Sequence, residues 1–217
     1  MPKLVELNHA IEAGMVTYKG LPGPFICDYL SREGSKGLYV EDTTFQIGKI
    51  EMVSNTGTYL DTPFHRYADG ADLCCMPLSA VTQLPGLVVR SEGPAIGPEA
   101  FSHLSVKGMA VLVHTGWDRH WRTDAYFTGH PFLTEAAAIY LRDAGAALVG
   151  IDSHNIDDTG GRARPVHTIL LGAGIPIVEH LTELGELPDG GFTFNAPPPR
   201  IKGMGTFPVR AHAVIAD

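Results

Sequence analysis

Residues 54–70, SNTGTYLDTPFHRYADG, follow an apolar, β-branched run and combine a glycine with several chemically active side chains. Gly57 allows the backbone to turn after the preceding strand. If the next residues are extended, alternate side chains lie on one face, so Tyr59, Asp61 and His65 are expected to converge. Such a segment can supply a metal ligand and a proton carrier. A turn-rich loop with a capping aspartate and a solvated histidine is the alternative.

Residues 166–180, VHTILLGAGIPIVEH, contain the second group of candidate site residues. The pattern predicts a short apolar helical turn that contains His167, then a glycine bend, then a buried strand that ends at Glu179. A carboxylate at the end of an apolar strand must be paired, hydrogen-bonded or bound to a metal. The alternative to a metal is a salt bridge to one of three arginines, Arg162, Arg164 or Arg210.

Apolar runs with β-branched residues predict strands along most of the chain, and helices are few. The clearest helix follows Thr134 as N-cap and ends before Gly145 as the C′ residue, and a shorter helix is predicted over Pro98–Leu104. No repeat or linker divides the chain, so residues 1–217 are predicted to form one mixed α/β domain that is rich in strands. The predicted strands are Phe45–Val53, Leu87–Arg90, Ala110–His114, Ala147–Ile151, Ile175–Val178, Phe192–Asn195 and Val209–Ile215.

The composition excludes several classes of function. The net charge of −8 and the lack of a basic cluster argue against nucleic acid as a partner. Three cysteines, two of them adjacent, indicate a reducing compartment, and no apolar run is long enough to span a bilayer. We therefore expect a cytoplasmic protein without a membrane partner. Charged residues make up only 18%, which is typical of a surface partly covered by another subunit.

The sequence resembles the cyclase superfamily that includes bacterial kynurenine formamidase and isatin hydrolase. The family signature His-x-Gly-Thr-His-x-Asp-x-Pro-x-His is matched by residues 55–65, NTGTYLDTPFH, with Asn55 and Tyr59 in place of its first two histidines. The resemblance implies a β/β/α, swivelling-domain-like cyclase fold and a homodimer or homotetramer whose subunits share parts of the active site. It extends over nearly the whole chain through the segments LNHAIEAGMVTYKGLPGP, HTGWDRHW, VGIDSHNID, VHTILLGAGIPIVEHLTEL and RIKGMGTFPVR.

The resemblance also implies a set of metal ligands. Kynurenine formamidases that resemble this chain bind two zinc ions, one through both early histidines and the aspartate, the other through the same aspartate with a later histidine and glutamate. By this match Asp61, His167 and Glu179 are ligands. An amide oxygen is a weak zinc ligand, and a tyrosine with a pKa near 10 ligates well only as a costly phenolate. With Asn55 and Tyr59 in the first site, we expect one divalent ion, Zn²⁺ or Mn²⁺, at the second.

The expected function is metal-dependent hydrolysis of an amide, lactam or lactone bond in a small carboxylated or aromatic molecule. The substitutions in the first metal site argue against N-formylkynurenine itself. His65 is predicted to act as general base and then as general acid, and Tyr59 to donate to the developing oxyanion. Asn55, Trp117 and His154 are predicted to contact the substrate.

Two other functions stay open at this point. Tyr59 and His65 could be the acid–base pair of a metal-independent cyclase, dehydratase or isomerase, or the chain could be a non-catalytic small-molecule binding protein. Two neighbouring features are given structural roles. Asp157 and Asp158 are predicted to lie in a solvated turn, and His180 to be a core or exposed residue.

Overall fold

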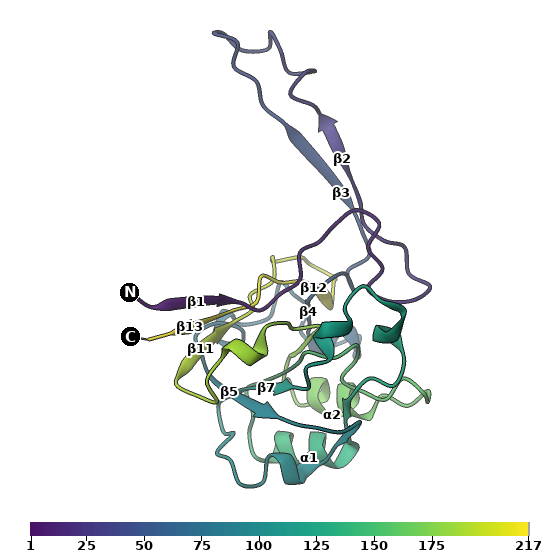
Figure 1. Ribbon diagram of the computed structural model, residues 1–217, viewed down its shortest axis with the longest axis vertical. Coiled ribbons are helices and arrows are strands. Elements are labelled where there is room, and N and C mark those ends of the chain that lie inside the picture. The colour runs from purple at the N-terminus through teal and green to yellow at the C-terminus, as the bar shows by residue number, and fades with distance from the viewer. Residues whose placement is uncertain (217) are drawn as a thin grey trace.

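The computed structural model describes residues 1–216, and β-strands dominate it (Figure 1). The strands are β1 (Lys3–Glu6), β2 (Phe25–Leu30), β3 (Ile47–Glu51), β4 (Tyr59–Asp61), β5 (Leu84–Arg90), β6 (Ala95–Ile96), β7 (Ala110–His114), β8 (Phe132–Leu133), β9 (Leu148–Ile151), β10 (Ile177–Glu179), β11 (Phe192–Asn195), β12 (Thr206–Pro208) and β13 (His212–Ile215). The helices are α1 (Glu135–Asp143) and α2 (Pro165–Gly172). The expected mixed α/β, strand-rich class is confirmed.

Nine of these strands form one sheet in the order β1-β13-β11-β5-β7-β9-β10-β4-β12. The central strands β5, β7, β9 and β10 are parallel, and the pairs toward both edges are antiparallel. Parallel neighbours need a crossover, and α1 and α2 lie in the two connections that lead into and out of β9. Strand β10 also pairs antiparallel with β4, although the two strands lie far apart in the sequence.

The two faces of the sheet pack against separate cores. Along β7, Val111 and Val113 belong to the core that includes residues of both helices, whereas Ala110 and Leu112 belong to the other core. This alternation is the period of a strand buried on both faces. The second core includes Val5 from one edge strand and Leu60 from β4 near the opposite edge. The residue Asn8, just after β1, also forms a bridge with Leu181, just after β10. A flat sheet in this strand order would hold these two strands tens of ångströms apart, at about 4.8 Å per strand, so the sheet must curl.

Local signals at helix ends were predicted with mixed success. Thr134 caps α1, its side chain accepting a hydrogen bond from the Ala137 amide, and Gly145 follows in the left-handed region with φ of +80°. The expected helix over Pro98–Leu104 is wrong beyond its first residues, because the chain forms a 3-10 turn only over Pro98–Ala100. Turns of this kind lack the length that makes a helix stable on its own.

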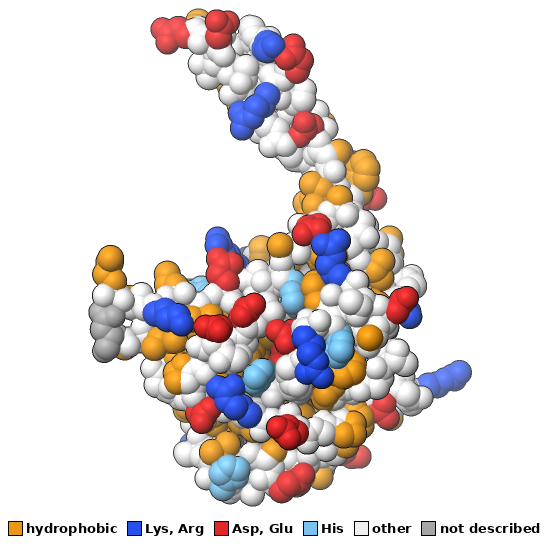
Figure 2. All heavy atoms as spheres, viewed as in Figure 1, with side chains coloured by type: hydrophobic (Ala, Val, Ile, Leu, Met, Phe, Trp, Pro, Cys, Tyr) orange, Lys and Arg blue, Asp and Glu red, His pale blue; other side chains and the backbone are white. Residues whose placement is uncertain are grey.

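Strands β2 and β3 form an antiparallel hairpin that projects from the body of the molecule, which we call the arm, residues 25–51 (Figure 1). Strand β3 lies within the strand predicted over Phe45–Val53, but all five of its residues are exposed and it is not part of the main sheet. Figure 2 shows hydrophobic side chains at the base of the arm and charged ones toward its tip. Its exposed large hydrophobic residues are Phe25, Ile26, Tyr29, Leu38, Tyr39, Val40, Ile47 and Ile50.

Within residues 1–216 no helix has both the length and the apolar character that crossing a membrane would require. Cys27, Cys74 and Cys75 are free thiols, as the odd count and the adjacent pair predict.

Candidate active site

The register of β4 determines which side chains meet at the candidate site. Strand β4 lies between β10 and β12 and pairs antiparallel with both. The pairing sets Tyr59 opposite Glu179 and Asp61 opposite Thr206. Residues directly opposite in an antiparallel pair have neighbouring side chains. The hydroxyl of Tyr59 accordingly donates to Glu179 Oε2 at 2.6 Å, and that of Thr206 donates to Asp61 Oδ1.

His65 reaches the same place through the tight turn that follows β4. The turn, Pro63–His65, begins with proline, whose fixed φ suits a first helical position. Gly205 passes directly over it, and a Cβ added at Gly205 would lie 2.3 Å from the backbone nitrogen of His65. Only glycine permits this approach. His65 Nδ1 lies 2.8 Å from Thr206 Oγ1, so Thr206 connects His65 to Asp61.

Helix α2 supplies His167, which is oriented by Asp157. Asp157 accepts hydrogen bonds from the Val166 amide (2.8 Å) and the His167 amide (3.1 Å) at the start of the helix. Its Oδ2 also lies 2.6 Å from His167 Nδ1. The other ring nitrogen, Nε2, is thereby directed at the carboxylates of β4 and β10. A carboxylate behind a histidine in this way fixes the ring and its tautomer for metal binding.

Asp157 was predicted to lie in a solvated turn, and that prediction is wrong. Its exposed fraction is 0%, whereas Asp158 beside it is exposed. The sequence does contain a signal for this role. Asp157 lies shortly before Pro165, the first residue of a helix. The free backbone amides at a helix start favour a nearby hydrogen-bond acceptor.

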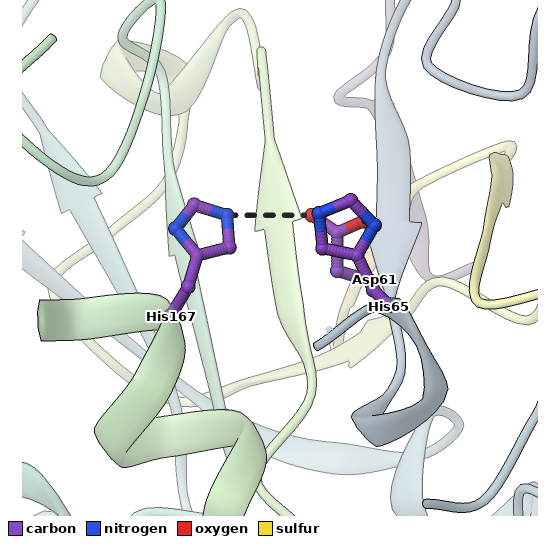
Figure 3. A group of neighbouring side chains, drawn as sticks. All are labelled: Asp61, His65 and His167. Atoms are coloured by element: carbon purple, nitrogen blue, oxygen red, sulfur yellow. Dashed lines mark ion pairs between the residues drawn. The ribbon is translucent and has the colours of Figure 1, made fainter. Parts of the chain in front are cut away.

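Asp61, His65 and His167 meet from three elements, and Figure 3 shows His167 approaching the other two from the opposite side. One ligand atom from each can be chosen so that all lie within 4.8 Å of one another. His167 Nε2 is also 3.7 Å from both Asp61 Oδ2 and Glu179 Oε1. Asp61 and His167 therefore meet with His65 beside them, and Glu179 approaches the group through His167 Nε2. That Asp61, His167 and Glu179 together hold a metal stays a prediction.

One atom of this group lacks a partner. Asp61 Oδ2 is buried and accepts no hydrogen bond from any described residue. Leaving a charged buried oxygen unsatisfied is costly, so the site is electrostatically incomplete without a cation. Two ligands of a tetrahedral zinc ion are about 3.3 Å apart, close to the 3.7 Å separations found around His167 Nε2. The residues present thus fit a divalent ion.

The protonation states show the same excess of negative charge. Burial alone would lower the pKa of His167, but Glu179, Asp157 and Asp61 together outweigh burial and raise it to about 10. Burial raises the pKa of Glu179 to about 7; Asp61 adds to that rise and His167 opposes it. The protein places more carboxylates here than one imidazole can neutralise, which is an arrangement that attracts a cation.

Tyr59 belongs to a different network, which is complete. Burial, reinforced by Glu179 and Asp61, raises the pKa of Tyr59 well above its usual value, so the phenol is neutral. Its proton is donated to Glu179, so its oxygen accepts from His180 Nε2 at 3.3 Å. His180 Nδ1 then accepts from the hydroxyl of Tyr126 at 2.8 Å. Since this proton is already committed, the structure disfavours a Tyr59–His65 acid–base pair.

The salt-bridge alternative for Glu179 is wrong. Its oxygens accept from the Ile156 amide (2.7 Å) and from Tyr59, and no arginine in the described part of the chain pairs with it. Arg164 donates to backbone carbonyls, and Arg210 binds Glu6 on a different strand. Glu179 also has fewer free lone pairs for a metal than Asp61 has.

A cavity of about 270 Å³ opens over this site. Asn55, Tyr59 and His65 line it, and their roles in substrate binding and catalysis stay predictions. Trp117 and His154 are not among its lining residues: the Trp117 indole donates to the Tyr126 carbonyl, and His154 packs on Tyr18. Their contact with substrate stays a prediction.

Comparison with known proteins identifies the chain. Residues 5–158 match the model of the family described as "Putative cyclase", and the kynurenine formamidase of Salinibacter ruber (strain DSM 13855 / M31) is 30% identical over 177 residues, which span 79% of this chain and 81% of the relative. The chain belongs to the cyclase family. Within that family, the signature aspartate and final histidine are present as Asp61 and His65, and the ligand candidates His167 and Glu179 lie beyond the matched residues.

Solved structures agree with this assignment. A protein described as a potential metal-dependent hydrolase with cyclase activity superposes with a TM-score of 0.81 at 26% identity, covering 100% of both chains. Isatin hydrolase A from Labrenzia aggregata superposes with a TM-score of 0.83 at 20% identity, covering 100% of this chain and 94% of its own, which shows the same fold.

Proposed function

We propose that this member of the cyclase family is a metal-dependent hydrolase of an amide, lactam or lactone bond in a small molecule. The observation that carries the proposal is the buried Asp61 Oδ2, which has no hydrogen-bond partner within residues 1–216 and lies 3.7 Å from His167 Nε2. Membership of the family supports hydrolysis, because the curated relative at 30% identity is a kynurenine formamidase and the superposed protein is described as a potential metal-dependent hydrolase.

Asp61, His167 and Glu179 would hold one divalent ion, Zn²⁺ or Mn²⁺. Such an ion acts as a Lewis acid and lowers the pKa of bound water toward neutrality. The two carboxylates and the imidazole suit either metal. Asn55 and Tyr59 stand where the family signature has histidines, and Tyr59 is a neutral, hydrogen-bonded phenol, which argues for one ion rather than two.

His65 is the proposed proton carrier, and its neighbours set its tautomer. Thr206 has one hydroxyl proton and donates it to the carboxylate of Asp61, which can only accept. Thr206 Oγ1 must then accept from His65 Nδ1–H at 2.8 Å. His65 Nε2 is left with its lone pair, so that it can take a proton from water and then return it to the leaving group. The side chain is 35% exposed, so substrate can reach it.

The predicted homo-oligomer is also proposed, with the arm as its contact. An isolated two-stranded hairpin is at best marginally stable in water, and this one carries a row of exposed hydrophobic side chains. Packing on a second copy would bury them. Sedimentation of the full chain should show a dimer or tetramer, and replacing Tyr29 and Ile50 together with serine should shift it toward monomer. A wild-type monomer would contradict this proposal.

The hydrolase is tested with metal and substrate together. Protein purified without added metal should contain about one equivalent of a divalent ion, and chelation should abolish hydrolysis of formanilides or lactams, with Zn²⁺ or Mn²⁺ restoring it. H65Q should retain the ion and lose turnover, because it removes the proton carrier and no proposed ligand. Protein that binds neither ion and turns over no member of the panel would overturn the proposal.

A further inference from the structure

The charges that line the cavity differ from those of the chain as a whole. The chain carries 24 carboxylates and 16 Lys and Arg residues. Histidines aside, the charged side chains of residues 1–216 that line the cavity are those of two arginines, Arg66 and Arg164, and no acidic residue of that range lines it. Asp61 and Glu179 are each 1% exposed and lie beneath the lining. An acidic protein thus presents positive charge to whatever enters this cavity.

Arg66 is held by one edge of its guanidinium group. It follows the turn that ends at His65, and its Nε donates to Thr168 Oγ1 of α2 at 3.2 Å. Thr168 in turn donates to the carbonyl of Arg164 at 2.8 Å, so one hydroxyl connects the two arginine-bearing segments. Arg66 forms no ion pair with a described carboxylate. Its two terminal amino groups are therefore oriented and available.

Arg164 is held in the same one-sided way. Its Nη1 donates to the carbonyls of Asp158 (3.0 Å), Gly161 (2.9 Å) and Ala163 (2.7 Å), while Nε and Nη2 bond to no described residue. Its charge acts within the cavity: burial raises the pKa of Tyr18, a lining residue, and Arg164 opposes that rise. The second guanidinium is thus also positioned with free donors.

Four of the other eight arginines meet a carboxylate of the protein, in the pairs Arg90–Asp189, Arg122–Glu12, Arg142–Asp143 and Arg210–Glu6. The remaining four form no such pair with a described residue, but none of them lines this cavity. With so many acidic groups available, two arginines that face a cavity without such a partner indicate a carboxylate supplied from outside. Guanidinium groups bind carboxylates through paired N–H donors.

We propose that Arg66 and Arg164 form an anion subsite that binds a carboxylate group of the substrate at the rim of the cavity. The inference deepens the proposed hydrolase function and rests on it for the reaction. Arg66 adjoins His65, and Arg164 precedes α2, which carries His167, so the carboxylate lies beside the reacting bond. About 270 Å³ suffices for one aromatic ring with its substituents. The substrates are therefore aromatic amides or lactams that carry a carboxylate, rather than neutral ones.

Direct binding tests the subsite without requiring turnover. The probes are 2-aminobenzoate and its neutral counterpart 2-aminobenzamide, titrated by fluorescence into the full chain, both as purified and after chelation, so that a contact between carboxylate and metal is recognised. R66Q and R164Q should each weaken 2-aminobenzoate binding about tenfold in both forms, the loss expected for one charged hydrogen-bonded contact. R66K should be intermediate, because lysine lacks the paired donors. Binding of 2-aminobenzamide should not change.

The matched control is R142Q, which removes an arginine that is already paired with Asp143 on α1 and should bind both probes like the wild type. Arg164 also donates to loop carbonyls, so R164Q is first checked for folding by thermal unfolding. If R164Q is unfolded, the test rests on R66Q. Wild-type protein that binds the two probes equally, or an R66Q variant that binds 2-aminobenzoate like the wild type, overturns the subsite.

Kinetics separates this inference from the hydrolase proposal. With N-formyl-2-aminobenzoate, R66Q should raise KM about tenfold and leave kcat within threefold, and kcat/KM for neutral formanilide should be unchanged. If the metal-loaded protein hydrolyses neither of these compounds nor any other member of the panel, while 2-aminobenzoate binding still depends on Arg66, the hydrolase proposal fails and the subsite stands. If both are hydrolysed equally well by wild type and variants, hydrolysis stands and the subsite fails.

Discussion

Two side chains of strand β4, two residues apart on the same face, have opposite bonding states. Around Tyr59 the polar atoms are satisfied: its hydroxyl, both oxygens of Glu179 and both ring nitrogens of His180 have partners. Around Asp61 they are not, because Oδ2 has none among the described residues. A complete buried network stabilises the fold, whereas an incomplete one marks the place where a ligand completes it. We therefore expect the hydrogen bond of Tyr59 to serve the fold, and the group around Asp61, which Glu179 approaches through His167, to hold the ligand.

The largest effect is expected from D61N. Metal content should fall below detection and hydrolysis by about 1000-fold or more, since an amide cannot replace the anionic ligand. The metal-free variant should nevertheless be more stable than metal-free wild type by about 1 kcal/mol, because it removes a buried charge with an unsatisfied oxygen. Metal analysis and urea unfolding measure both. D69N changes an exposed aspartate nearby and should alter neither metal content nor stability. If metal-free D61N is less stable than metal-free wild type, Asp61 belongs to a network that is already complete without a ligand.

The next effect concerns the ring of His167. D157N weakens the bond that orients Nδ1, and metal affinity should fall about 10- to 100-fold, the range for residues that support a ligand histidine. D158N is the matched control, since it changes the adjacent, exposed aspartate. Competition with a chelator of known affinity measures the difference. Equal affinities of the two variants would show that Asp157 only caps α2.

The contrast between Asp157 and Asp158 shows what sequence can and cannot predict here. Strand periodicity and end signals lie within one element, so β7, β9, β11 and the cap at Thr134 were predictable. The family motif also located Asp61 and His65. The role of Asp157 depends on a partner in the following helix, and the local Asp-Asp-Thr-Gly-Gly sequence is equally typical of a solvated turn.

The register of β4 with β10 and the projection of the arm could not be predicted from the sequence either. The bond between Tyr59 and Glu179 exists because β4 and β10 pair in one register, and a shift by one residue would break it. Nothing in the apolar pattern of Phe45–Val53 distinguishes a strand in the sheet from one in an exposed arm. Likewise, that Arg66 and Arg164 have no carboxylate partner among the described residues can be seen only once the positions of the surrounding carboxylates are known.

On the complete side of β4, Y59F should affect stability more than catalysis. It removes the donor to Glu179 Oε2, and losing a bond to a buried carboxylate costs about 2 kcal/mol of unfolding free energy. Hydrolysis should stay within tenfold of wild type. Y67F is the matched control, because its hydroxyl donates to a neutral carbonyl of Thr168, and it should cost about 1 kcal/mol. A 1000-fold loss of turnover in stable Y59F would instead place Tyr59 in the catalytic machinery, as the oxyanion prediction has it.

The smallest effect concerns His154, an exception on the Tyr59 side because its buried Nδ1 lacks a partner among the described residues. Burial, aided by His130 and Lys19, lowers its pKa to about 3, so it is neutral in the folded state. The unfolded chain, with a pKa near 6.5, takes up the proton first, so this stability contribution is complete above pH 6.5 and declines as the pH falls toward 3. A neutral nitrogen without a partner costs less than a carboxylate oxygen, which explains why the fold tolerates it without a ligand.

H154Q should therefore flatten the dependence of unfolding free energy on pH between 6 and 5 by about 1 kcal/mol per pH unit. The raised pKa of Glu179 acts with the opposite sign in this range, since the folded state then binds the extra proton, but it is common to both proteins and cancels in the difference. H103Q, at an exposed histidine, should keep the wild-type slope. Urea unfolding at closely spaced pH values measures the slopes. If H154Q keeps the full slope, His154 is protonated in the folded state. Its Nδ1, which lacks a partner among the described residues, would then mark a second ligand-binding position, close to Tyr59.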